Sequence, residues 1–111
     1  MHPISPIELE TFLGLEGSIF TVMKTGPPGA VDLEFGPVEL TLVKSTDRSS
    51  EYMTAFSVLF HGPKSQEFGQ GNYKLFHTQL HDIDLFLVPV LDPGLDAELV
   101  CYEAVFSRLK E

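Results

Sequence analysis

The sequence predicts an all-β fold of about six mainly antiparallel strands, closed as a small barrel or stacked as a sandwich, with one short N-terminal helix. Three observations support this class. From residue 17 onward, apolar side chains recur with a period of two, and many are β-branched or aromatic. Clusters of Gly, Pro, Asn and Asp interrupt these stretches. No helical period intervenes between successive strands, so chain neighbours are expected to pair antiparallel.

The helix is expected over residues 5–13. Ser5 suits the N-cap, Pro6 suits the first helical position, and Glu8 completes a capping box. Apolar residues then form one stripe until Gly14, which ends the helix.

Residues 17–108 contain the strands. We expect them at residues 18–24, 38–45, 53–61, 72–77, 83–90 and 99–107. Residues 25–29 read Thr-Gly-Pro-Pro-Gly and are expected to form a loop, because proline lacks a backbone donor and glycine pairs poorly in sheets. Gly62 and Pro63 are expected to end one strand for the same reason. Pro89 is expected to limit pairing near the end of another strand.

Size and charge restrict the class of protein. A length of 111 residues predicts a single domain, residues 1–111, with one core. The net charge of −9 opposes binding to nucleic acid and to anionic membranes. No apolar stretch is long enough to span a membrane, and no signal peptide is apparent. The single cysteine, Cys101, suits a reducing compartment, so we expect a cytoplasmic protein in which Cys101 packs as a small apolar side chain.

The alternation of apolar and polar residues fades at residues 56–60 and 85–88. Both faces of such strands are expected to avoid water, and one of them meets the core. The other face is either covered within the chain, by the N-terminal helix or by the loop at 25–36, or forms an exposed patch for protein contacts. The residues assigned to this contact surface are Phe56, Phe60, Phe86 and Val88.

A small-molecule-binding barrel or a hydrolase-like enzyme is the alternative function. It would draw on a polar cluster of His77, His81, Asp82, Asp84 and Glu103. His77 and His81 converge on a metal when they share one helix face, but the flanking strand patterns place them at the two ends of a turn. The sequence contains no phosphate-binding loop, nucleophile elbow, zinc-protease helix or paired Cys motif. We therefore assign no catalytic residue, no metal ligand and no cofactor.

Glu103 stands in an otherwise apolar strand. Its carboxylate must face water, pair with a cation or accept hydrogen bonds. The candidate partners are Lys24, Lys44, Lys74 and Arg108. A general acid with a raised pKa is the other interpretation of this residue.

Four segments carry a family resemblance. They are FSVLFHGP at 56–63, QGNYKLFH at 70–77, LFLVPV at 85–90 and YEAVF at 102–106. They resemble an uncharacterised bacterial family of small β-rich proteins, one of the numbered domains of unknown function, and the resemblance covers about residues 53–108. The resemblance implies no established activity and an accessory role in a phage-tail-like assembly. The chain has Leu80-His81 where the family pattern has Leu-Gly, so His81 is not expected to be a site of the family.

The leading interpretation is a non-enzymatic β domain that binds a protein partner or assembles with copies of itself. The second apolar face and the open edge of the central strands would make the contact. A third alternative is an acidic module for a cationic partner, whose affinity would fall steeply with salt.

Overall fold

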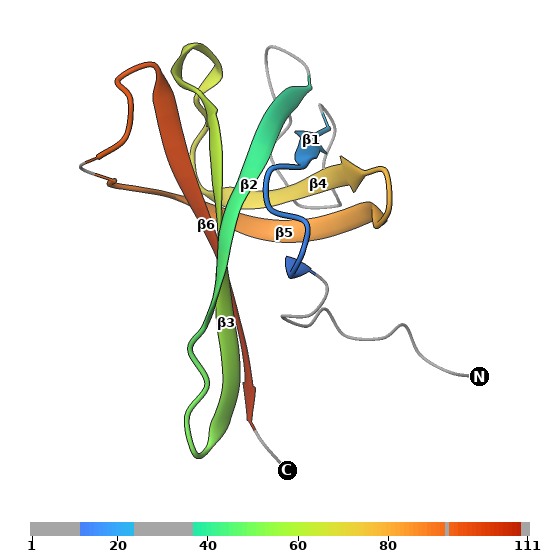
Figure 1. The fold of residues 1–111 in the computed structure, drawn as a ribbon. Helices are drawn as coiled ribbons and strands as arrows, with labels where there is room; N and C mark the ends of the chain where they lie inside the picture. Colours follow the sequence, from blue (N-terminus) through green and yellow to red (C-terminus); the bar gives the residue numbers. More distant parts are fainter. Residues whose placement is uncertain (1–11, 24–36, 93, 110–111) are drawn as a thin grey trace.

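The structure is a computed structural model and describes residues 12–23, 37–92 and 94–109. Its elements are β1 (Ile19–Val22), β2 (Val38–Asp47), β3 (Met53–Pro63), the 3-10 helix η1 (Lys64–Gln66), β4 (Gly71–His77), β5 (His81–Val90) and β6 (Leu99–Leu109). The strands close into a barrel in the order β1-β2-β3-β6-β5-β4, and all neighbours are antiparallel (Figure 1). The predicted all-β class and its six strands are confirmed, and the architecture is a barrel rather than a sandwich.

The helix predicted over 5–13 and the loop predicted over 25–36 lie almost wholly outside the described residues. Phe12 is helical, and the turns of residues 13–17 then lead into β1, with positive φ angles at Gly14 and Gly17. The only complete helix in the described ranges is η1. A helix with the length and apolar character needed to cross a membrane is absent from these ranges.

The two prolines of β3 and β5 lie where the ladder is incomplete. β3 runs two residues past its predicted end, through Gly62 and Pro63, which pair with β6. The pairing of β3 with β2 extends only as far as His61. Pro89 likewise pairs with β6, after the pairing of β5 with β4 has ended at Leu87. Proline is tolerated in both strands because its missing N–H is not needed toward a second neighbour.

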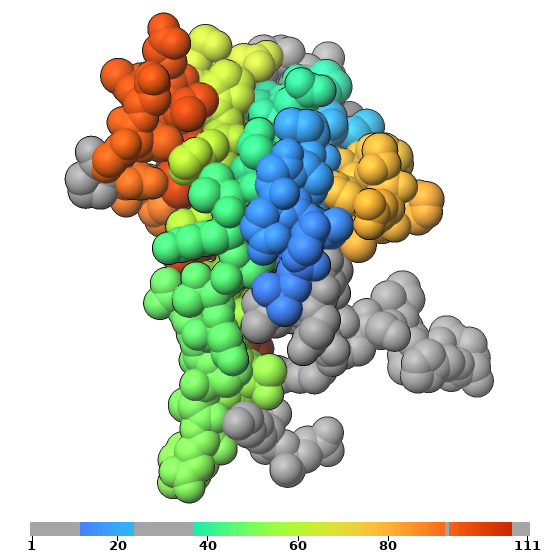
Figure 2. Space-filling model, in the orientation of Figure 1, coloured from blue at the N-terminus to red at the C-terminus, as the bar shows by residue number. Residues whose placement is uncertain are grey.

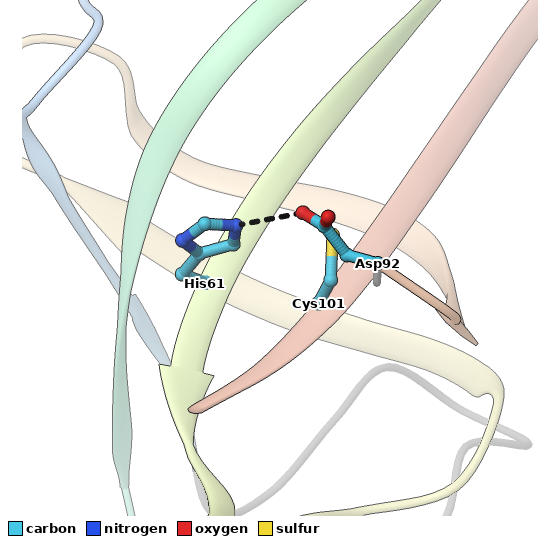
Figure 3. A group of neighbouring side chains, drawn as sticks. All are labelled: His61, Asp92 and Cys101. Carbon is cyan, nitrogen blue, oxygen red and sulfur yellow. Dashed lines mark ion pairs between the residues drawn. The ribbon is translucent and has the colours of Figure 1, made fainter. Parts of the chain in front are cut away.

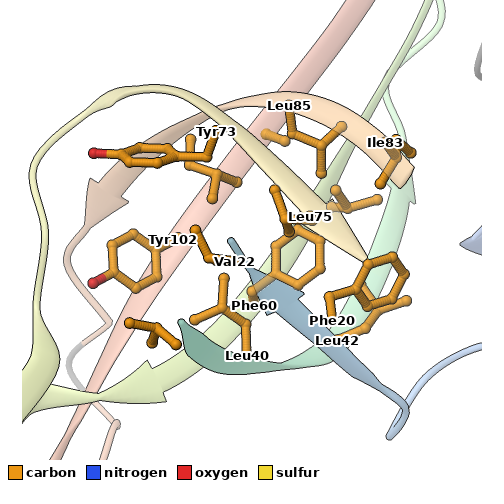
Figure 4. Close-up of a cluster of buried hydrophobic side chains, with 14 of the residues drawn as sticks. Phe20, Val22, Leu40, Leu42, Phe60, Tyr73, Leu75, Ile83, Leu85 and Tyr102 are labelled. Carbon is orange, nitrogen blue, oxygen red and sulfur yellow. The ribbon is translucent and has the colours of Figure 1, made fainter. Parts of the chain in front are cut away.

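The barrel interior is filled by the protein's own side chains. Successive residues of a strand point to opposite faces, so each strand contributes every second side chain to the core. The buried residues labelled in Figure 4 are Phe20, Val22, Leu40, Leu42, Phe60, Tyr73, Leu75, Ile83, Leu85 and Tyr102. An interior packed in this way is a hydrophobic core rather than a ligand cavity.

Aromatic rings close both ends of the barrel. At one end, the ring centroid of Phe12 lies 6.1, 6.1 and 6.0 Å from those of Phe20, Phe56 and Phe106, respectively. At the other end, Phe68 stacks on Tyr102 with a centroid distance of 4.3 Å, and its ring lies 4.6 Å from that of Tyr73. The backbone N–H of Phe68 also donates to the Tyr102 hydroxyl oxygen over 3.1 Å. The two rings that close the barrel ends, those of Phe12 and Phe68, therefore come from segments that lie outside the strands.

Two of the predicted contact residues are in the core. Phe56 and Phe60 are buried, so the prediction that they lie on an exposed contact surface is wrong. The reason is that both point inward from β3, a strand that has a neighbour on each side for most of its length. On β5, by contrast, Phe86 is 48% exposed and Val88 is partly buried. The outer face of β5 is thus left open at Phe86.

An arm extends from the barrel. β3 pairs with β6 along all of its residues, from Met53 to Pro63, and β2 follows β3 as far as Asp47. The end of β2, the start of β3 and the end of β6 project beyond β4 and β5 (Figure 1). In Figure 2, the green atoms of β2 and β3 extend below the rest of the barrel. β5 pairs with only three residues of β6, of which Glu103 is the last along the chain. Residues 104–109 of β6 consequently have a backbone edge that faces no strand in the described part of the chain.

Candidate functional site

The predicted polar cluster of His77, His81, Asp82, Asp84 and Glu103 does not form. His77 is buried, whereas Asp82 and Asp84 are exposed, because alternate residues of a strand point to opposite faces. Among the described residues, the group of three potential metal ligands that lie close together contains none of these five. The prediction that these five residues form a common site is therefore wrong.

His77 has a structural role at the β4–β5 turn. The backbone N–H groups of Gln79 and Leu80 donate to its Nδ1 over 3.0 and 3.3 Å. Since Nδ1 accepts, the ring proton is on Nε2, which donates to Ser18 Oγ over 3.0 Å. The ring centroid also lies 4.4 Å from that of Phe20. Neutral His77 thus ties the turn to the start of β1, and burial lowers its pKa.

His81 occupies the glycine position of the turn. Its φ angle is 58°, in the left-handed region, which glycine adopts at little cost and side chains with a Cβ adopt rarely. It pairs across the turn with His77. The resemblance implies a Leu-Gly turn here, and the backbone keeps a conformation that suits glycine although the residue is histidine.

Replacing His81 with glycine is expected to raise the free energy of unfolding by up to about 1 kcal/mol. The left-handed conformation is unfavourable for a side chain with a Cβ, and the greater freedom of glycine in the unfolded chain offsets part of the gain. Urea unfolding measures the difference. The His81→Ala variant keeps the Cβ but not the imidazole, and should show no gain. A similar gain in both variants would mean that the imidazole, not the backbone, carries the strain.

Glu103 forms an ion pair on the outer face of β6. Its Oε2 lies 3.7 Å from Nη2 of Arg48, which is not among the partners predicted for it. Arg48 follows β2 and also donates from Nε to Ser57 Oγ over 2.9 Å. Of the three alternatives for this carboxylate, the structure shows pairing with a cation. Among the described residues, Glu103 does not belong to the group of potential metal ligands that lie close together.

A different group of side chains comes together on the outer face of the barrel. His61 of β3 and Cys101 of β6 are direct cross-strand neighbours. Asp92 follows β5, whose Val90 pairs with Cys101 from the other side. Each of the three side chains offers one donor atom, and the three donor atoms lie within 4.8 Å of one another. Nε2 of His61 and Oδ2 of Asp92 are 3.7 Å apart (Figure 3).

The turn after β5 orients the Asp92 carboxylate. Its Oδ1 accepts the backbone N–H of Gly94 over 3.3 Å, and the Asp92 carbonyl accepts the N–H of Leu95 over 2.9 Å. The other carboxylate oxygen, Oδ2, is thereby left to face His61. A hollow of about 430 Å³ lies beside the group, and Asp92 and Cys101 form part of its wall. The group is therefore held by strands on one side and is open on another.

Cys101 is buried as predicted, but outside the barrel core. Its neighbours Val100 and Tyr102 belong to the core, so Cys101 points outward, beneath the β5–β6 connection, with 1% of its surface exposed. Burial raises the pKa of the thiol, the carboxylates of Asp92 and Glu103 raise it further, and Lys44 acts in the opposite direction. Nucleophilic cysteines need an accessible sulfur and a lowered pKa. Cys101 has neither, which argues against a catalytic thiol.

The sequence analysis missed this group for a topological reason. His61 and Cys101 are far apart in the sequence, and only the register of β3 on β6 makes them neighbours. No local pattern indicates that β6 inserts between β3 and β5. The one available signal was the alternation of side chains along the strand. Cys101 lies between two residues that point into the core, so its own side chain must point outward.

Comparisons with known proteins place the chain in a family. Searches of curated proteins and of solved structures found no match. A family model described as Domain of unknown function (DUF6916) matches residues 7–106, which include every strand except the last three residues of β6. The match also contains the four segments that carry the resemblance. Because it covers well over half of the sequence, the chain belongs to this family of domains of unknown function.

Proposed function

We propose that this domain is a non-enzymatic protein-binding module that takes up an extended segment of a partner along the free edge of β6, by which we mean the backbone edge of residues 104–109 that faces no strand among the described residues. The observation that carries the proposal is the edge itself: residues 104–109 continue as a strand after the pairing with β5 has ended. An unpaired edge presents backbone N–H and C=O groups, to which an added strand can bind.

Exposed apolar side chains flank this edge. Val105 of β6 is 60% exposed, and Phe86 of β5 is about half exposed. Val88 of β5 pairs with Glu103 of β6, and the two strands are antiparallel. Phe86, two residues before Val88, and Val105, two residues after Glu103, therefore lie on the same side of this pair. A strand added to β6 would place alternate side chains over these residues, which supply the apolar part of the contact.

Three features support a non-enzymatic role. The predicted polar residues are dispersed, the barrel interior is filled, and the one thiol is buried. A cytoplasmic setting would keep that thiol reduced. The resemblance implies a phage-tail-like assembly as the setting in which such a module would act.

The test compares the wild type with a double variant, Phe86→Asp and Val105→Asp. Both side chains are exposed, so the fold should be retained, which circular dichroism and the unfolding midpoint verify. The control is Tyr52→Asp, which alters a more exposed aromatic residue at the β2–β3 turn. All three proteins serve as bait in extracts of the source cell, and their masses are measured by light scattering across concentrations.

A partner that the wild type and Tyr52→Asp retain but the double variant loses supports the proposal. A mass that doubles with concentration, except in the double variant, identifies the partner as a second copy. If the wild type stays at the mass of one chain, and any captured protein binds all three baits equally, the proposal is wrong.

A further inference from the structure

We propose that His61, Asp92 and Cys101 form a binding site for a divalent transition-metal ion, with Zn²⁺ as its representative, on the outer face of the barrel. The site is separate from the proposed function, because it involves neither the free edge of β6 nor Phe86. It is carried by the placement of three different donor types at one point of the sheet.

The distances between the three donor atoms are close to those found around a bound zinc ion. In a tetrahedral zinc site with ordinary Zn–S, Zn–N and Zn–O distances, the donor atoms are roughly 3.3–3.6 Å apart. The imidazole nitrogen of His61 and the carboxylate oxygen of Asp92 are already 3.7 Å apart, and all three donor atoms lie within 4.8 Å of one another. Side-chain adjustments of about 1 Å therefore complete the arrangement, and such adjustments need no change in strand pairing.

The supporting structure is rigid on two sides. His61 and Cys101 lie opposite each other in β3 and β6, strands that pair over eleven residues, so their separation is set by the sheet. The hydrogen bond from Gly94 to Oδ1 of Asp92 fixes the third donor. Hydrogen bonding of a ligating carboxylate through its other oxygen is a common feature of metal sites.

The charges around the thiol favour a cation. Asp92 and Glu103 both place negative charge near Cys101, Lys44 offsets part of it, and Glu103 is also paired with Arg48. A metal ion at this point would offset the remaining negative charge. It would bind the thiolate, and the thiol proton would leave to solvent when the Zn–S bond forms.

The donor set selects the metal, and the hollow lies beside the site. Thiolate and imidazole ligands favour Zn²⁺ and similar ions over Mg²⁺ or Ca²⁺, which prefer oxygen. Three protein ligands leave the fourth tetrahedral position for water. That position can open on the hollow, whose wall includes Asp92 and Cys101.

The experiment uses untagged full-length protein freed of metal with a chelator. Titration with Co²⁺ should produce a thiolate-to-cobalt charge-transfer band and the visible bands of tetrahedral cobalt, saturating at one ion per chain. Zn²⁺ should displace Co²⁺ and release close to one proton per ion, as measured by calorimetry in buffers of different ionisation enthalpy.

The variants separate the site from adventitious binding. Cys101→Ser should abolish the charge-transfer band, and His61→Ala should weaken Zn²⁺ binding on the order of 100-fold. Asp92→Asn changes an exposed loop residue, so it tests the site even if a strand variant fails to fold. The control, His81→Ala, removes an exposed imidazole elsewhere and should bind as the wild type does. If the wild type shows no charge-transfer band, or if Asp92→Asn and His81→Ala bind Zn²⁺ equally well, the proposal is overturned.

Discussion

Replacing Phe12 with alanine is expected to lower the free energy of unfolding by about 3–5 kcal/mol. The ring is fully buried at one end of the barrel, where it contacts the rings of Phe20, Phe56 and Phe106. These three residues belong to β1, β3 and β6, so no single shift of the chain can fill the gap that the variant leaves. Urea unfolding followed by circular dichroism measures the loss.

Leu13→Ala is the matched control for this prediction. Leu13 is the next residue in the chain but is 50% exposed. Its truncation is expected to change the free energy of unfolding by no more than about 1 kcal/mol. If the two variants lose the same stability, Phe12 does not close the barrel in the way described.

Replacing His77 with alanine is expected to cost about 2–4 kcal/mol. The variant loses a buried ring that packs on Phe20, and it leaves the N–H groups of Gln79 and Leu80 and the Ser18 hydroxyl without their imidazole partner. The control is His81→Ala, which removes an exposed imidazole that makes no such bonds in the described structure. A loss in His77→Ala no larger than in His81→Ala would contradict the assigned role.

The dependence of stability on pH provides a second measurement for His77. Burial lowers its pKa from the ordinary 6.5. Above pH 6.5 the imidazole is neutral in the folded and the unfolded chain, and its contribution to stability is complete. As the pH falls below 6.5, the unfolded chain takes up a proton that the folded chain resists, so the free energy of unfolding falls, by at most about 1.4 kcal/mol per pH unit. The decline ends at the folded pKa, and His77→Ala should lack this component.

Much of the fold could be predicted because core packing imposes local rules. In β2, the buried Val38, Leu40 and Leu42 alternate with the polar Glu39 and Thr41, so their period of two was visible in the sequence. Turn residues were equally informative: the left-handed φ angle of His81 lies at the position where the family pattern has glycine. Such rules depend on residues near each other in the chain, and they hold whichever strands become neighbours.

The sites could be predicted less well because they depend on strand order. The cation that pairs with Glu103 is Arg48, which is brought to β6 by the intervening β3. His61 and Cys101 likewise meet only through the register of β3 on β6. The apolar run containing Phe56 and Phe60 was read as a strand with a second face for contacts, but burial is decided by where the strand lies in the barrel.

The position of β6 also has a consequence for synthesis. β6 is the sixth strand along the chain but lies between β3 and β5 in the barrel. While residues 99–109 are still within the ribosome, the other five strands can form at most an open sheet, with β3 and β5 as its edges and its apolar inner face accessible to water. A chain that ends before this segment therefore keeps its apolar inner face exposed, and chaperones and proteases recognise such surfaces. The closed barrel buries this face, so quality control can distinguish incomplete chains from complete ones.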